Sequence, residues 1–203
     1  MKRINTLLLA GMVLFGVAAA QARGLPDVRM RGVITAFDGQ TLQVDTREGK
    51  SFNVGISRDT RISLLYPRKL RDIKPGSFVG ITAIQTDADL PLLAREVHIF
   101  AESQRGTGEG HYGWDLEPGS SMTNANVDAI VNSNDGKVLS LSYKGGSQQI
   151  AVPRGTPIVS FKPADRSILK KGVQIFCIAK RSAGGSLTAR HILAGQNGMK
   201  PPM

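Results

Sequence analysis

The chain has 203 residues, of which 26 are lysine or arginine and 16 are aspartate or glutamate, giving a formal net charge of +10. This charge favours anionic partners, although the basic residues are scattered rather than grouped, which equally fits a plain solvated surface. The single cysteine, Cys177, excludes an internal disulfide. It lies in an apolar run typical of a strand, so we expect it to pack as a small hydrophobic side chain.

Residues 1–22 have the pattern of a secretory signal peptide cleaved after Ala22. Lys2 and Arg3 give a charged start, an apolar run follows from Leu7 to Ala20, and the segment ends in a small-x-small pattern. The run is short for a permanent membrane span, and an uncleaved anchor is the alternative interpretation. The mature chain has no second long apolar segment. The sequence therefore predicts a soluble protein that is periplasmic or secreted.

Export narrows the class of partner. Nucleic acid is a poor candidate outside the cell, and aromatic residues, which stack on bases, make up only 5% of the chain. An envelope protein, an anionic envelope polymer or a lipid surface fits the charge and the expected location better.

Short segments of period two dominate the chain after residue 22 and indicate antiparallel strands. Residues 41–45 and 51–57 alternate apolar and polar side chains, as half-buried strands do. Asp38-Gly39 lies between two such segments and predicts a tight hairpin turn, and Glu48-Gly49 predicts the next. Strands at this spacing predict a small barrel or sandwich.

The second half of the chain repeats the landmarks of the first in the same order. Residues 33–42 match 130–139 around an Asp-Gly turn, and 93–97 match 188–192. This predicts an internal duplication. The expected fold class is all-β, with two tandem small OB-like antiparallel β-barrels that close to remove their edge strands. We expect repeat 1 at 28–100, a Gly-rich linker at 101–125, repeat 2 at 126–194 and a disordered tail at 195–203.

The repeat resembles a bacterial family of exported β-repeat domains of unknown function. The resemblance covers about residues 28–194. It rests on the first repeat, from Arg31-Gly-Val-Ile through Leu70-Arg-Asp-Ile-Lys-Pro-Gly76 to Ala94-Arg-Glu-Val97, and on the linker 106–116 with Met122-Thr-Asn-Ala125. It implies export and a β-barrel fold and carries no established activity. Members are often named metal ABC transporter permeases, a function that needs several apolar spans that this chain lacks.

The linker holds the candidate site residues. Glu109, His111 and Asp115, with Glu117 nearby, supply the nitrogen and oxygen ligands that a divalent metal prefers, so metal binding is one hypothesis. In the other hypothesis the linker is a structural joint in which Trp114, the only tryptophan, packs between the barrels. The same segment offers Trp114, Arg105 and His111 as contacts for a partner.

No enzymatic motif accompanies these residues. The chain has no G-x-S-x-G motif, and its glycine-rich run lacks the lysine and hydroxyl residue of a phosphate-binding loop. His98 and His191 lie in the last strands of the two repeats, at the predicted rims of the barrels. A site that these two histidines share with His111 is a further hypothesis. We therefore expect a non-enzymatic binding or assembly module of the envelope without a bound cofactor. A periplasmic divalent-metal-binding protein is the alternative, and a polysaccharide hydrolase is a more distant one.

Overall fold

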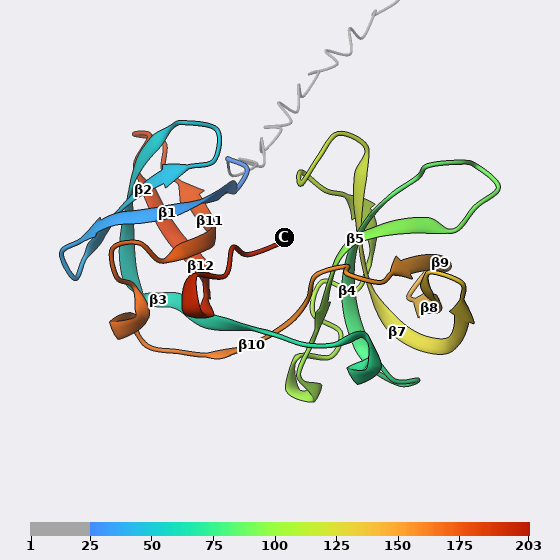
Figure 1. Cartoon of the computed structure of the whole chain (residues 1–203). Coiled ribbons are helices and arrows are strands. Elements are labelled where there is room, and N and C mark those ends of the chain that lie inside the picture. Colours follow the sequence, from blue (N-terminus) through green and yellow to red (C-terminus); the bar gives the residue numbers. More distant parts are fainter. Residues whose placement is uncertain (1–24) are drawn as a thin grey trace, which may run out of the picture.

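The computed structural model describes residues 25–203, and the signal peptide predicted for residues 1–22 lies outside the described residues. The described chain is all-β, and its helical elements are 3₁₀ turns of three residues (Figure 1). The strands are β1 (Val28–Phe37), β2 (Thr41–Thr46), β3 (Ser51–Pro67), β4 (Phe78–Ile84), β5 (Leu92–Ile99), β6 (Gly110–Gly113), β7 (Ser120–Ser133), β8 (Gly136–Tyr143), β9 (Gly146–Pro153), β10 (Ile158–Pro163), β11 (Gln174–Arg181) and β12 (Leu187–Gly195). The 3₁₀ turns are η1 (Leu70–Asp72), η2 (Glu102–Gln104), η3 (Arg166–Ile168) and η4 (Gln196–Gly198).

Five strands from the two ends of the chain form a closed barrel, called here the first ring. β1 pairs with β2 and β2 with β3, while β11 pairs with both β1 and β12. The parallel pairing of β12 with β3 closes the ring, with Ile192 opposite Ile62. Closure leaves each of these strands paired on both sides, which removes the exposed edges of an open sheet.

Five strands from the middle of the chain pair in the same order and form the second ring. β7 pairs with β8 and β8 with β9, while β4 pairs with both β7 and β5. A short parallel contact of β5 with β9, at Leu92 and Leu93, joins the ends of this set. The order matches the first ring strand for strand, with β7, β8 and β9 in the places of β1, β2 and β3.

Two strands connect the rings. β3 extends beyond the first ring and pairs through residues 63–67 with β10, which also lies parallel to the end of β5. Figure 1 shows the rings side by side, with β3 leading out of one and β10 returning from the other. The two connecting strands therefore run along one another where the rings meet.

This pairing differs from the domain boundaries that the sequence suggested. Residues 28–100 and 126–194 do not each form a barrel, because β1–β3 complete their ring with β11 and β12 rather than with β4 and β5. β4 and β5 instead pair with β7 and β9 in the second ring. Part of the expected linker is also strand, since β6 lies within it and β7 begins at Ser120.

The local patterns behind the strands are those seen in the sequence. β2 alternates buried and exposed residues, with Leu42 and Val44 fully buried. The turn before it is stabilised by the Asp38 carboxylate, which accepts hydrogen bonds from the amides of Gln40 and Thr41 at 2.8 and 2.7 Å. Gly39 takes a φ of +95°, which residues with a Cβ rarely adopt.

Each ring encloses its own apolar core. Leu139, Leu141 and Ile150 are among the buried residues of the second ring, and Ile34 and Ile175 among those of the first. Cys177 belongs to the first core, and burial raises the pKa of its thiol to about 12. It packs as a small apolar side chain, as its position in the sequence predicted.

The tail predicted to be disordered instead packs against the protein. η4 follows β12 directly, and Met203 is 3% exposed in a third apolar cluster with Phe176 and Leu193. The Arg31 side chain donates to the Met203 carbonyl at 2.7 Å, and Arg47 donates to the Pro201 carbonyl at 2.8 Å. Burial of the methionine and these two bonds offset the entropy that a free tail would keep.

Within residues 25–203, no helix has the length and apolarity needed to cross a membrane.

A candidate binding pocket between the rings

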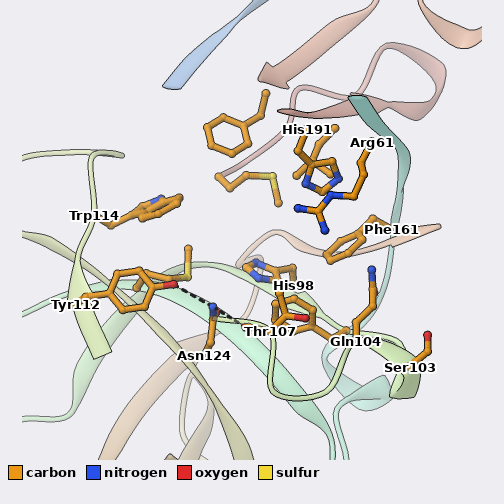
Figure 2. A pocket seen from close by; sticks show the side chains of 15 residues that line it. Arg61, His98, Ser103, Gln104, Thr107, Tyr112, Trp114, Asn124, Phe161 and His191 are labelled. Atoms are coloured by element: carbon orange, nitrogen blue, oxygen red, sulfur yellow. Dashed lines mark hydrogen bonds between the residues drawn. The ribbon is translucent and has the colours of Figure 1, made fainter. Parts of the chain in front are cut away.

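A pocket of about 330 Å³ lies where the two rings meet. Strands of both rings contribute to it, together with the connecting strand β10, the segment after β5 and the tail (Figure 2). Its size falls in the lower range of small-molecule pockets. The residues that line it are Arg61, His98, Phe100, Ser103, Gln104, Thr107, Tyr112, Trp114, Met122, Asn124, Phe161, Phe176, His191, Leu193 and Met203.

Aromatic side chains form two groups along the pocket. Phe100 contacts His98 edge-on, with ring centroids 4.6 Å apart, and lies 5.5 Å from Phe161. In the second group Trp114 lies 6.3 Å from Tyr112 and 6.4 Å from Phe176. Methionine and leucine side chains add to this lining, which provides an apolar surface suited to a planar or aliphatic group.

Buried polar atoms without partners concentrate at this pocket. Among the described residues, four buried side-chain atoms make no hydrogen bond, and three of them belong to lining residues: His98 Nδ1, Trp114 Nε1 and Asn124 Oδ1. Leaving such a group unpaired costs about 1–3 kcal/mol. Of these three atoms, His98 Nδ1 faces the Glu96 carboxylate at 3.5 Å, which leaves Trp114 Nε1 and Asn124 Oδ1 as the unpaired atoms without such a neighbour.

The backbone position of Gly80 makes room for two of these residues. Gly80 of β4 lies opposite His98 on β5 and opposite Asn124 on β7. A Cβ at Gly80 would overlap the His98 imidazole and lie 2.5 Å from Asn124 Oδ1. The glycine therefore lets the imidazole and the amide lie over the same stretch of β4 at the pocket wall.

Hydrogen bonds fix the orientation of Asn124. Its Nδ2 donates to the carbonyls of Thr107 and Gly108 at 3.2 and 3.0 Å and approaches the Tyr112 hydroxyl at 3.0 Å. With the amide nitrogen used in this way, Oδ1 is the atom left free to accept a hydrogen bond.

A buried carboxylate lies behind His98. Glu96 is fully buried, and its Oε1 accepts a hydrogen bond from the Thr82 hydroxyl at 2.6 Å. Its Oε2 faces His98 Nδ1 at 3.5 Å, longer than a normal hydrogen bond. This pairing favours a proton on Nδ1 and leaves Nε2 toward Gly80 and Asn124.

His191 and Arg61 stand at another wall, where β12 and β3 pair. His191 Nε2 lies 3.1 Å from the Ser63 hydroxyl. Burial, and to a lesser degree the charge of Arg61, lowers the pKa of His191 to about 4, so the imidazole is neutral near pH 7. The Arg61 side chain is exposed and makes no ion pair among the described residues.

The proposed metal ligands of the linker do not meet. Glu109 accepts a hydrogen bond from the Lys144 amide at 3.0 Å, and His111 Nδ1 bonds the Thr123 hydroxyl at 2.8 Å. Asp115 pairs with Arg31 at 2.8 Å. No group of three or more histidine, cysteine or acidic residues in residues 25–203 is arranged to hold a metal ion. The metal site predicted at Glu109, His111 and Asp115 is therefore not formed by these residues.

Of the three predicted partner contacts, Trp114 alone lines the pocket. Arg105 is committed to internal contacts: it donates to both carboxylate oxygens of Glu102, at 2.5 and 2.7 Å, to the Gly76 carbonyl at 2.8 Å and to Asn126. His111 stacks against Tyr143, with ring centroids 6.4 Å apart, outside the pocket.

Sequence reasoning missed most of the polar lining. The sequence left open the hypothesis that His98, His191 and His111 share one site. His98 and His191 do line a common pocket, but His111 lies outside it. Nothing in the sequence marked Arg61 as a binding residue. Asn124 was noted only as part of the linker motif. Comparison with known protein families, with curated proteins and with solved structures gave no match. The family resemblance stays a prediction.

Proposed function

We propose that this protein is an exported, non-enzymatic binding module whose site is the pocket between the rings. The observation that carries this proposal is the pair of unpaired buried atoms, Trp114 Nε1 and Asn124 Oδ1, within an otherwise aromatic lining. A small amphipathic ligand would cover the aromatic surface and supply the missing hydrogen bonds. Binding in the envelope agrees with the signal-like segment at residues 1–22.

We also propose that both rings are OB-like barrels derived from one duplicated unit. The identical pairing order of the two five-strand sets supports this, as do the matched landmarks of the two halves. In this interpretation the two copies exchanged their last two strands, and the pocket arose beside the paired strands β3 and β10.

The sole tryptophan makes the proposal directly testable. Trp114 lines the pocket, so its fluorescence reports binding there without a label. We expect small amphipathic compounds to change its emission in a saturable way and to raise the melting temperature as the ligand concentration exceeds Kd. Asn124→Ala should weaken such binding at least about fivefold, because it removes the Oδ1 acceptor and also the bonds from Nδ2 to the Thr107 and Gly108 carbonyls.

A matched control is available on the same strand. Asn132 of β7 is exposed and far along the strand from the pocket lining, so Asn132→Ala should leave the affinity unchanged. If a broad set of amphipathic compounds changes neither the Trp114 emission nor the melting temperature, the pocket is not a binding site and the proposal is wrong.

A further inference from the structure

The side chains that line the pocket include a positively charged group but no negatively charged one. The lining contains an arginine and two histidines and no aspartate or glutamate. Trp114 Nε1 and the Arg61 guanidinium can only donate hydrogen bonds, so only an acceptor on a ligand can pair with them. The described lining therefore offers donors at Trp114 and Arg61 and an acceptor at Asn124 Oδ1, and it carries a positive charge and no negative one.

Arg61 is the lining side chain free to meet an anion. It lies on β3 directly opposite His191 of β12, and Figure 2 shows its guanidinium reaching into the pocket near both His98 and His191. Other arginines around the pocket are already paired: Arg31 with Asp115 at 2.8 Å, and Arg29 over the Trp114 ring at 4.4 Å. Arg61 has no such partner among the described residues.

The opposite side of the pocket is apolar. Figure 2 places Trp114 and Tyr112 across from Arg61, and Phe176, Leu193 and Met203 belong to one apolar cluster that Trp114 packs against. A ligand that fits both sides would place an apolar or aromatic body beside Trp114 and a charged group at Arg61.

We propose that the pocket recognises a small organic anion, with a carboxylate, sulfonate or phosphate group held by Arg61 and an apolar body packed against Trp114. This inference rests on the proposed function and adds the chemical class of the ligand. A guanidinium suits such oxyanions because its planar donors match two oxygens at once.

Two dyes separate the charge from the apolar body. 8-Anilinonaphthalene-1-sulfonate and N-phenyl-1-naphthylamine share the same aromatic ring system. The first dye has a negatively charged sulfonate group, and the second dye is uncharged. Both become fluorescent in apolar pockets, and energy transfer from Trp114 identifies the molecules bound beside it. We expect the sulfonate dye to bind the parent protein, and Arg61→Gln to raise its Kd about five- to twentyfold through the loss of a charge-assisted hydrogen bond. The Kd of the uncharged dye should not change.

The control removes an equal charge from the same strand. Arg58 is exposed on β3 and does not line the pocket, so Arg58→Gln should leave both dyes unaffected. If Arg61→Gln and Arg58→Gln weaken the sulfonate dye equally, the effect is general surface charge and the inference is wrong. If the uncharged dye binds beside Trp114 and the sulfonate dye gains nothing from Arg61, the pocket binds neutral ligands and only this inference fails. If neither dye shows energy transfer from Trp114, the proposed function fails with it.

Discussion

At the scale of single residues, the pocket depends on a position that has no side chain. Gly80 lies between His98 and Asn124 on neighbouring strands, and the space over it is filled by their polar groups. In sequence Gly80 is one of 23 glycines, and nothing local distinguishes it from the others. Its role follows from which strands flank β4, and sequence alone does not give that pairing.

Gly80→Ala should reduce stability and binding together. The added methyl group would overlap the His98 imidazole, and the packed wall around it allows little movement, so we expect a loss of about 1–3 kcal/mol in the free energy of unfolding. Urea denaturation measures this. Gly55→Ala is the control, since a Cβ there meets its nearest atom at 3.5 Å and should cost almost nothing. Equal losses in both variants would contradict the crowding at Gly80.

His191 should make stability sensitive to acid. The pKa of His191 is lowered to about 4 by burial and by Arg61, so between pH 6.5 and 4 the unfolded chain binds a proton that the folded chain does not. Stability should therefore fall as the pH drops through this window and level off below it, by about 1–3 kcal/mol from this residue.

The variant His191→Gln isolates that contribution. Glutamine keeps a hydrogen-bonding group near Ser63 but does not titrate, so the loss of stability between about pH 7 and pH 4.5 should be smaller than in the parent. Acidic side chains such as Asp38 and Asp72, whose pKa values are lowered by hydrogen bonds, contribute equally to both proteins. An identical acid loss in parent and variant would show that His191 titrates normally.

At the scale of elements, the sequence predicted strands well and their ends less well. Period-two alternation correctly located β2 and the start of β3, and Asp38-Gly39 located the first turn. The tail is the clearest failure. Prolines and glycines near a terminus are typical of disorder, and the contacts that order this tail come from Arg31 and Arg47, more than 150 residues away along the chain.

The tail should contribute to stability through its last side chain. Met203 is buried against Phe176 and Leu193, so Met203→Ala should lower the free energy of unfolding by about 1–3 kcal/mol, near the low end for buried methionines because a tail relaxes readily. Met199→Ala is the comparison, since Met199 is only partly buried and should cost less. Thermal unfolding followed by circular dichroism measures both. Equal midpoints for parent and Met203→Ala would mean that the tail is loose in solution.

At the scale of the whole molecule, the all-β class was predictable but the division of the chain was not. Hairpin turns and alternation are local, and the sequence therefore revealed them. The choice between β4–β5 and β11–β12 as partners of β1–β3 depends on contacts between residues as distant as Ile62 and Ile192. The pocket could not be predicted from the sequence for the same reason. Arg61, His98 and His191 come together only because β3 pairs with β12.

The interleaved rings predict that neither half of the chain folds alone. A fragment of residues 25–100 lacks β11 and β12, which close the first ring, and a fragment of residues 101–203 lacks β3, to which β12 pairs. Each fragment should show no cooperative thermal transition, whereas an equimolar mixture should regain one and elute as a single complex on size exclusion. A cooperative transition of residues 25–100 by themselves would mean that β1–β5 can form a ring without help.

The pairing of β1 with β11 and of β3 with β12 also delays closure of the first ring during synthesis. A chain that emerges N-terminus first, from a ribosome or through a membrane pore, presents β1, β2 and β3 long before β11 and β12 exist to receive them. Until then the unfinished sheet has open edges, which attract other chains, and the long loop between its parts slows closure. Assembly of the first ring therefore waits for the last strand, and any factor that shields β3 during that wait would govern the yield of folded protein.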